Sequence, residues 1–160
     1  MLRQLSEAPN LPLLLGFAGL VPFFGGAFLL ALGGPAAAQA AIALAIYAAV
    51  ILSFLAGGRW TAEIVLRADA PRTGVLALAV ILSLSGWIAV LLHGVDPSGL
   101  PANPELVGWG VLIAGFTIQY LWDRGAVRGG TLPRWYLPLR LVLTFGAVVS
   151  LGAVLAIRAL

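Results

Sequence analysis

The chain has 160 residues, of which 61% are hydrophobic and 9% are charged, whereas an ordinary globular domain has about 25% charged residues. This composition argues against a water-soluble protein, and the absence of cysteine excludes disulfides, thiolate metal sites and cysteine nucleophiles. The net charge of +3 does not indicate a nucleic-acid partner, because the arginines are dispersed between apolar runs instead of forming one basic face. We therefore expect an all-α integral membrane protein with a single transmembrane domain over residues 1–160.

Two long apolar runs open the chain. The first, residues 11–32, carries no charge and is long enough for a spanning helix of about 20 residues, and Pro22 inside it predicts a kink. A cleaved signal peptide is the alternative, although its apolar region is typically only about 7–15 residues long. The second run, residues 38–66, is too long to lie wholly within a hydrocarbon core of about 30 Å.

The length of this second run leaves two positions for Arg59. Either Arg59 lies among the lipid headgroups and the helix continues into the cytoplasm, or it lies about 12 Å beneath the membrane surface. The third run, residues 73–93, follows after a short turn, which keeps the two helix ends level. If the second helix extended into water, the third would be too short to span. We therefore expect Arg59 inside the bundle, paired with Glu63 or Asp123.

Residues 105–123 and 138–158 form two further apolar runs, and these predict the fourth and fifth helices. Basic residues lie in the connection between the second and third runs and in that between the fourth and fifth, whereas the other two connections have none. Basic connections are typically cytoplasmic. We expect a five-transmembrane-helix bundle with the N-terminus inside and the C-terminus outside.

Several polar residues inside the apolar runs form a candidate site in the cytoplasmic leaflet. Arg59 and Glu63 are four residues apart, as are Gln119 and Asp123, so each pair shares a helix face. An intramembrane charge costs at least about 2.5–3.5 kcal/mol, so these charges should face the interior and find partners. The candidate polar cluster or ligand site consists of Arg59, Trp60, Glu63, Gln119, Asp123, Trp135, Tyr136 and Arg140.

Four stretches carry a resemblance to a known family. They are GFAGLVPF in the first helix, ILSFLAGGRW in the second, QYLWDR in the fourth, and LPRWYLPLRLVLT leading into the fifth. In this order they resemble the domain of unknown function 3429 family, whose members are transmembrane protein 69-like. The resemblance implies a small multi-spanning protein of bacterial or mitochondrial inner membranes, and it brings no catalytic residues to carry over.

The motifs of common enzymes are missing from this chain. It has no HExxH motif, nucleophile elbow or phosphate loop, and it has a single histidine. We expect no catalytic residues, no metal site and no cofactor. The sequence favours a structural or accessory subunit that is stabilised by the intramembrane cluster of arginines and acids.

Two other functions remain open. One is a lipid- or quinone-binding membrane protein that uses the polar cluster as its site, since arginine suits phosphate and carboxylate groups. The other is a small-solute transporter, although the repeated halves that are common in transporters are not evident. The expected partners are membrane lipids, together with either a larger membrane complex or a second copy of the chain, and no nucleic acid.

Overall fold

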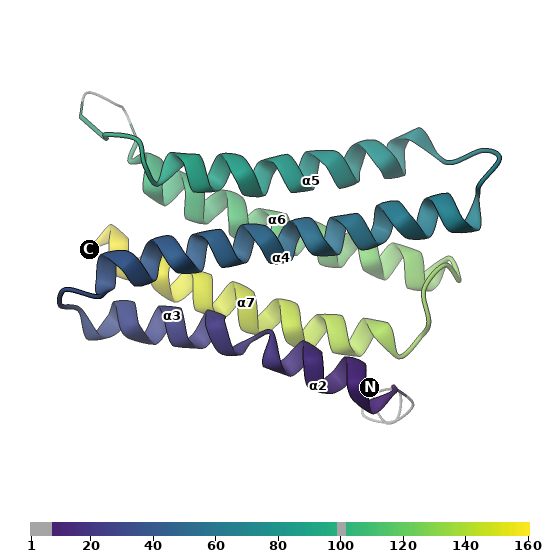
Figure 1. The fold of residues 1–160 in the computed structure, drawn as a ribbon, viewed down its shortest axis with the longest axis horizontal. Helices are drawn as coiled ribbons and strands as arrows, with labels where there is room; N and C mark the ends of the chain where they lie inside the picture. Colours follow the sequence, from purple (N-terminus) through teal and green to yellow (C-terminus); the bar gives the residue numbers. More distant parts are fainter. Residues whose placement is uncertain (1–7, 99–101) are drawn as a thin grey trace.

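The computed structural model describes residues 8–98 and 102–160, which form helices and no strands. The helices are α2 (Asn10–Ala18), α3 (Val21–Leu32), α4 (Ala37–Leu66), α5 (Thr73–Leu92), α6 (Pro104–Arg128) and α7 (Tyr136–Ala159). The all-α prediction is therefore confirmed. The helices lie side by side along one long axis, and the first described residues and the C-terminus lie at opposite ends of the bundle (Figure 1).

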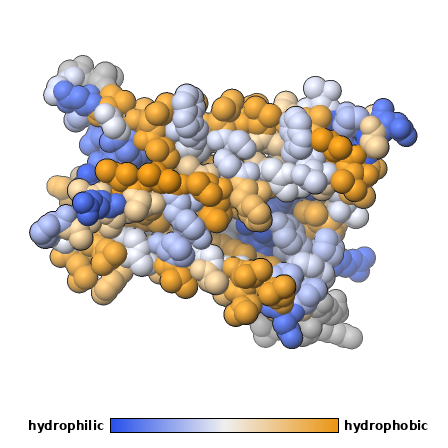
Figure 2. Space-filling model, in the orientation of Figure 1, coloured by the Kyte–Doolittle hydropathy of each residue, from blue (hydrophilic) through white to orange (hydrophobic). Residues whose placement is uncertain are grey.

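Four stretches of the described residues are long and apolar enough to cross a membrane. They are Asn10–Leu32, Ala37–Leu66, Thr73–Leu92 and Tyr136–Ala159. On the face shown in Figure 2, strongly hydrophilic residues lie mainly toward the two ends of the bundle, and hydrophobic residues interspersed with near-neutral ones cover the part between them. The chain is a multi-pass membrane protein, because bilayer lipid can cover such an apolar band and water cannot do so favourably.

The α6 helix is not among these four stretches, although the sequence predicts a span over residues 105–123. Its polar residues Gln119 and Asp123 are fully buried, whereas Ile118 and Leu121 are exposed. Its low hydropathy thus reflects polar groups that face the bundle interior. The helix also continues beyond Asp123 to Arg128, because the Asp123 carboxylate is buried against other helices and does not mark a helix end in water.

The predicted kink in the first span takes the form of a break between α2 and α3. The break lies at Gly19 and Leu20, and Pro22 occupies the first turn of α3, where its missing N–H costs no hydrogen bond. The Tyr47 hydroxyl on α4 donates a hydrogen bond of 2.8 Å to the Gly19 carbonyl oxygen. A carbonyl group that the break leaves without a helical partner is thereby satisfied inside the protein, as the apolar environment requires.

Small residues allow the helices to approach closely around α4. A Cβ atom added at Gly86 of α5 would lie 3.2 Å from the Ala49 Cα atom, and one added at Gly115 of α6 would lie 2.6 Å from Leu52 Cδ2. Close backbone approach is the usual basis of helix association in membranes, where lipid removes the hydrophobic drive between helices. The α4 helix consequently occupies the centre of the bundle, with α3, α5 and α6 packed on it.

Candidate functional site

Asp123 is the centre of a buried polar cluster formed by α4, α6 and α7. Arg140 Nε donates a hydrogen bond of 2.8 Å to Asp123 Oδ2, and Gln119 Nε2 donates one of 3.2 Å to Asp123 Oδ1. Arg59 Nε lies 3.8 Å from Asp123 Oδ1. We call Arg59, Gln119, Asp123 and Arg140 the Asp123 cluster. The structure thus brings together four of the eight predicted site residues around one carboxylate.

The helices place these four side chains at one depth in the bundle. Asp123 follows Gln119 by one turn of α6, so both lie on the same buried face. Arg140 lies on α7 one turn after its first residue, and the connection over residues 129–135 returns this turn to the side of α6. Arg59 lies seven residues before the end of α4, which is about 10 Å inside that end.

Arg59 is buried and packs against an aromatic ring. Its side chain is 6% exposed, and its Cζ atom lies 4.7 Å from the centroid of the Trp122 ring. A guanidinium at this distance from an indole is attracted by the negative face of the ring. Trp122 and Asp123 therefore hold Arg59 from two neighbouring positions of α6, and the adjacent Trp60 takes no part in this contact.

The hydrogen bonds of the Asp123 cluster are incomplete within the described residues. Buried nitrogen atoms without a partner are Nε and Nη1 of Arg59 and Nη2 of Arg140, and Oε1 of Gln119 also lacks one. Two guanidinium groups face a single carboxylate, so the cluster carries one uncompensated positive charge. A buried polar group without a partner typically costs about 1–3 kcal/mol, and a charged one costs more.

Glu63 belongs to a separate ion-pair group at the end of α4. Its carboxylate accepts hydrogen bonds from Arg72 Nε at 2.8 Å, Arg72 Nη2 at 2.6 Å and the Arg72 backbone N–H at 2.9 Å, and it lies 3.6 Å from Arg67 Nε. The short turn between α4 and α5 brings Arg72 back over the last turn of α4. The Glu63 carboxylate is thus paired with Arg72 and Arg67. Of the two acids predicted as partners of Arg59, only Asp123 contacts it. The side-chain hydrogen bonds to Glu63 raise the pKa of the Arg72 guanidinium above its usual value.

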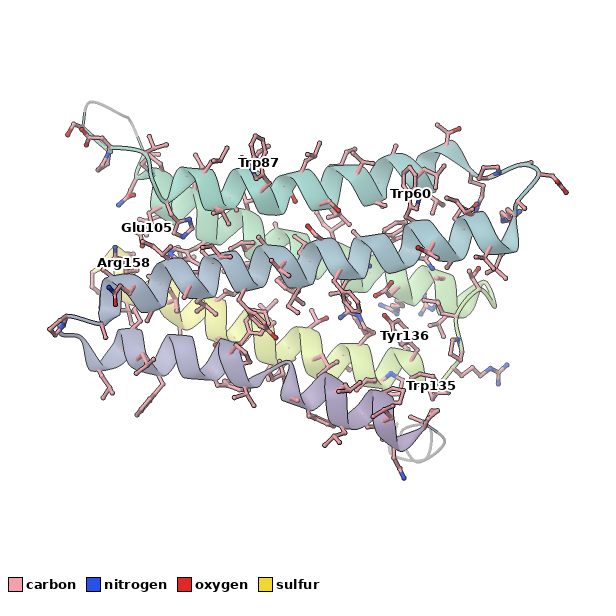
Figure 3. The ribbon with its side chains drawn as sticks, viewed as in Figure 1. Trp60, Trp87, Glu105, Trp135, Tyr136 and Arg158 are labelled. Atoms are coloured by element: carbon pink, nitrogen blue, oxygen red, sulfur yellow. The ribbon has the colours of Figure 1, made fainter. Side chains whose placement is uncertain are left out.

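The aromatic residues predicted for the site lie in two different places. Trp60 is 38% exposed and projects from the outer side of α4. Trp135 and Tyr136 lie beside Arg140 at the start of α7, with their ring centroids 6.0 Å apart. Figure 3 shows these two residues near the end of the bundle opposite to Glu105 and Arg158. Of the three aromatic residues predicted for the site, only Trp135 and Tyr136 therefore lie beside Arg140 of the Asp123 cluster.

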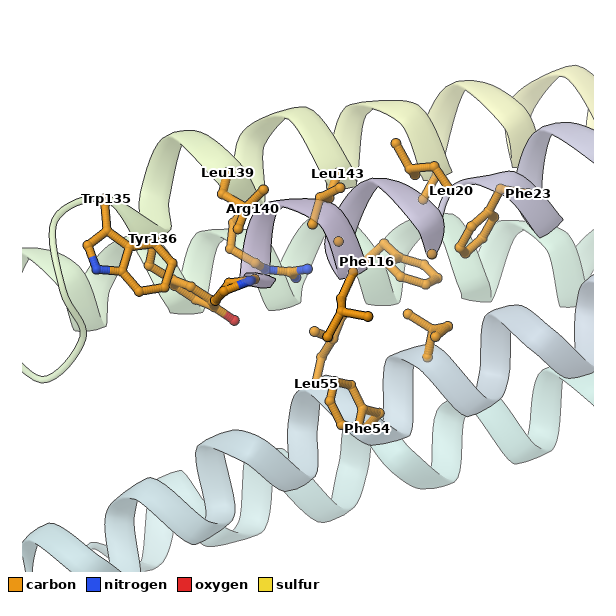
Figure 4. Close-up of a pocket in the computed structure, with 16 residues that line it drawn as sticks. Leu20, Phe23, Phe54, Leu55, Phe116, Trp135, Tyr136, Leu139, Arg140 and Leu143 are labelled. Atoms are coloured by element: carbon orange, nitrogen blue, oxygen red, sulfur yellow. The ribbon is translucent and has the colours of Figure 1, made fainter. Parts of the chain in front are cut away.

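An apolar cavity of about 330 Å³ extends from Arg140 toward the middle of the bundle. Figure 4 shows Trp135, Tyr136 and Arg140 at one end of it and Leu20 and Phe23 at the other. Its lining residues come from five helices and are Pro12, Leu15, Gly16, Gly19, Leu20, Phe23, Ile51, Phe54, Leu55, Phe116, Trp135, Tyr136, Leu139, Arg140, Leu143 and Ala147. We call this space the α2–α7 cavity.

The mouth of the α2–α7 cavity faces the bilayer. Leu15 on α2 is 61% exposed and Phe54 on α4 is 73% exposed, although both line the cavity. In this region α2 packs on α7 and diverges from α4 (Figure 1). A membrane-dissolved molecule can therefore enter laterally between α2 and α4, and the arrangement can bind such a molecule without exposing it to water.

Sequence reasoning missed three contributors to this region. Trp122 is not part of the candidate site predicted from the sequence, although its position next to Asp123 is a signal that it could contact the same partner. Arg72 is not part of it either, although a basic residue at the start of a helix after a short turn can reach back to an acid on the preceding helix. The cavity itself depends on the break between α2 and α3, and no sequence motif predicts this cavity.

The described residues contain no group of three or more histidine, cysteine, aspartate or glutamate side chains that could hold a metal ion. The acids are instead distributed singly among arginines: Asp123 in its cluster, Glu63 with Arg72, and Glu105 with Arg158 at the opposite end of the bundle. Each of these three acids has an arginine partner, so this cluster and these ion pairs can bind charged or hydrogen-bonding groups through guanidinium.

Comparison with known proteins gives two matches. The family described as Protein of unknown function (DUF3429) matches residues 8–156. The chain is similar to Transmembrane protein 69 of Xenopus tropicalis, with 33% identity over 151 residues that make up 94% of this chain and 55% of that protein. The chain thus spans about half the length of this curated relative. No solved structure matches the chain.

Proposed function

We propose a function from the geometry of the site, since the chain belongs to the family described as Protein of unknown function (DUF3429), a description that assigns no activity. The protein is a binding protein for a lipophilic molecule of the membrane, which enters the α2–α7 cavity from the bilayer. The observation that carries this proposal is the cavity itself, which is open between Leu15 and Phe54 and ends at the buried Arg140.

The size and chemistry of the cavity support this function. Ligand sites are typically about 300–1,000 Å³ in volume, mostly apolar, and equipped with a few polar groups that orient the ligand. The α2–α7 cavity holds about 330 Å³ and is lined almost wholly by apolar and aromatic side chains. Arg140 and Tyr136 supply polar groups at one end only. A cavity that is polar at one end and apolar elsewhere suits a molecule with an apolar body and one polar end, such as a lipid or a quinone.

We further propose that α6 is a fifth membrane span. The 25 residues of this helix, Pro104–Arg128, correspond to about 37 Å. This length exceeds the hydrocarbon thickness of about 30 Å, so the helix is long enough to span. Its outer face exposes Val107, Ile118 and Leu121. The described chain begins at one end of the bundle and finishes at the opposite end (Figure 1). An odd number of spans would produce this arrangement.

We propose an N-terminus inside and a C-terminus outside in a bacterial inner membrane, and the distribution of arginines supports this orientation. Arg67, Arg72, Arg124 and Arg128 lie at or beyond the ends of α4, α5 and α6 that share one end of the bundle. Arg158 lies at the other end, where its Nε and Nη2 atoms each donate a hydrogen bond of 2.6 Å to the Glu105 carboxylate. The four arginines at the first end outnumber Arg158 at the other, so the positive-inside rule, which counts basic residues, favours this orientation.

This topology predicts the location of a reporter fused after Leu160. We expect alkaline phosphatase at that position to be active, since it requires export, and green fluorescent protein to be dark. The same pair fused after Gly130, in the connection between α6 and α7, should give the reverse pattern. A fluorescent fusion after Leu160 would contradict either the span count or the orientation.

Ligand entry predicts a difference between two neighbouring substitutions on α2. Leu14 and Leu15 are 67% and 61% exposed, but only Leu15 lines the cavity. We expect Leu15→Trp to narrow the mouth and weaken binding of a lipophilic probe by roughly tenfold, equivalent to about 1.4 kcal/mol. Leu14→Trp adds the same indole toward lipid and should bind as the wild type does.

The measurement is binding of tritiated hexadecanol to the purified protein in nanodiscs, with the signal from empty nanodiscs subtracted. Equal loss of binding in both variants would point to a general effect on α2, and equal retention in both would place any bound probe outside the cavity. Either result would count against the proposed function.

A second candidate is an accessory subunit of a larger membrane complex. The outer side of α4 presents Ser53, Gly57 and Thr61 at intervals of four residues, and shallow grooves beside them are lined by Trp60 and Trp87. Small residues at this spacing permit close approach of another helix. Migration of the solubilised protein as a discrete large complex on a native gel would favour this candidate, and a 16.6 kDa species that retains a lipophile would favour the first.

A further inference from the structure

We infer that the molecule bound in the α2–α7 cavity is an anionic single-chain amphiphile, with its carboxylate or phosphate group at Arg140, where the positive charge of Arg59 also acts, and its chain directed toward Phe23. This inference rests on the proposed function, because it requires the cavity to be a binding site. It adds the chemical class of the ligand and its orientation.

The charge of the Asp123 cluster points to a missing anion. Arg59 and Arg140 are 6% and 4% exposed, and both approach the single carboxylate of Asp123. Glu63 cannot balance the second guanidinium, because it is engaged by Arg72 and Arg67. A buried unpaired charge is strongly unfavourable in a low-dielectric interior, so a ligand that brings one negative charge would be favoured by the cluster.

One arginine of the cluster lies where such a group can be received. Arg140 lines the cavity, gives its Nε to Asp123 and retains a buried Nη2 without a partner. Arg59 does not line the cavity, but it approaches the same Asp123 carboxylate and retains buried Nε and Nη1 atoms without a partner. Carboxylate and phosphate oxygens accept hydrogen bonds from guanidinium more strongly than a neutral carbonyl oxygen does. The donors therefore favour an anion over a quinone.

The position and volume of the cavity restrict the rest of the ligand. Arg140 lies four residues from the start of α7, about 6 Å along the helix, so the head of the ligand lies below the level of Trp135 and Tyr136. A small head group suits this depth better than a bulky glycerophosphate. The volume of about 330 Å³ lies at the lower limit for ligand sites, which favours one hydrocarbon chain over two.

The test is competition against tritiated palmitate bound to the wild-type protein in nanodiscs of zwitterionic lipid. The competitors are unlabelled palmitate, monohexadecyl phosphate, methyl palmitate and hexadecanol, which share a chain length and differ in the head group. We expect palmitate or the phosphate ester to compete at least about tenfold better than methyl palmitate and hexadecanol, equivalent to about 1.4 kcal/mol. Preference for one of the two anions identifies the head group.

A pair of arginine substitutions locates the anion site. Arg59→Gln removes a charge from the cluster and leaves the hydrogen bond between Arg140 and Asp123 intact, so we expect palmitate binding to fall by roughly tenfold while hexadecanol binding is retained. Arg134→Gln removes an exposed arginine near the same end of the bundle and should leave both unchanged. The head-group series on the wild type decides the question even if Arg59→Gln does not fold.

The failures of the two proposals are distinguishable. Equal competition by palmitate, methyl palmitate and hexadecanol in the wild type would overturn the anionic ligand and leave a binding site for lipophiles. Absence of specific binding by every probe would overturn the proposed function and this inference together. Parallel losses of palmitate binding in Arg59→Gln and Arg134→Gln would show surface attraction, and would also overturn the anion site.

Discussion

Replacing Asp123 with alanine is expected to lower the free energy of unfolding by about 3–5 kcal/mol, the cost typical of removing one partner from a buried ion pair. Asp123 is fully buried and is the shared acceptor of Arg140, Gln119 and, as an ion pair, Arg59. Its loss would leave two guanidinium groups in the bundle interior without an acid. We therefore expect this to be among the most damaging substitutions of a charged residue in the chain.

The effect can be measured by unfolding the purified protein in mixed micelles with increasing sodium dodecyl sulfate. Asp69→Ala is the matched control, since Asp69 is exposed in the turn between α4 and α5. The double substitution Asp123→Ala with Arg140→Met should recover much of the loss, because it removes a charge together with its partner. A change in Asp123→Ala no larger than in Asp69→Ala would show that the cluster contributes little to stability.

Arg59→Gln is expected to lower the free energy of unfolding less than Arg140→Gln does in the same measurement. Arg140 donates a 2.8 Å hydrogen bond to Asp123, whereas Arg59 approaches only to 3.8 Å and retains buried donors without partners. Loss of Arg140 removes the better partner, and loss of Arg59 removes the uncompensated charge. The comparison therefore separates the pair that holds α6 to α7 from the guanidinium that we assign to a ligand.

The second large effect is expected at the contact between Glu63 and Arg72, and it should be unequal for the two partners. Arg72→Ala would leave the buried Glu63 carboxylate with only the backbone N–H of residue 72 and the more distant Arg67, and we expect a loss of about 2–3 kcal/mol. Glu63→Ala would leave a guanidinium that is 47% exposed and can turn to water, so we expect a smaller loss. The carboxylate is the group that depends on this contact.

A double-mutant cycle of Glu63→Ala and Arg72→Ala, measured in the same micelles, gives the coupling free energy. Arg67→Ala is the control, because this half-exposed residue lies 3.6 Å from Glu63 and its loss should cost no more than about 0.5 kcal/mol. Additive effects of the two substitutions would mean that the contact does not fasten α4 to the start of α5. A larger loss in Glu63→Ala than in Arg72→Ala would contradict the assigned asymmetry.

Hydropathy and spacing by themselves predicted the all-α architecture and several features around the site. A run such as residues 38–66 can only be helical in lipid, since every backbone hydrogen bond must be made within the segment. Its predicted bounds differ by one residue from the observed α4, Ala37–Leu66. The spacing of Gln119 and Asp123 placed both on one face because helical periodicity is a local property. Their burial followed from the cost of charge in lipid.

Partner choice and the cavity were decided by tertiary structure. Glu63 and Asp123 were equally available to Arg59 from spacing alone, and only the return of Arg72 over the end of α4 assigned Glu63 elsewhere. The same holds for Trp60 and Trp122, because which of two nearby indoles meets Arg59 depends on the rotation of α4 against α6. The α2–α7 cavity requires α2 to leave α4 after the break at Gly19. Sequence periodicity determines which face of a helix is buried, whereas long-range packing determines what that face meets.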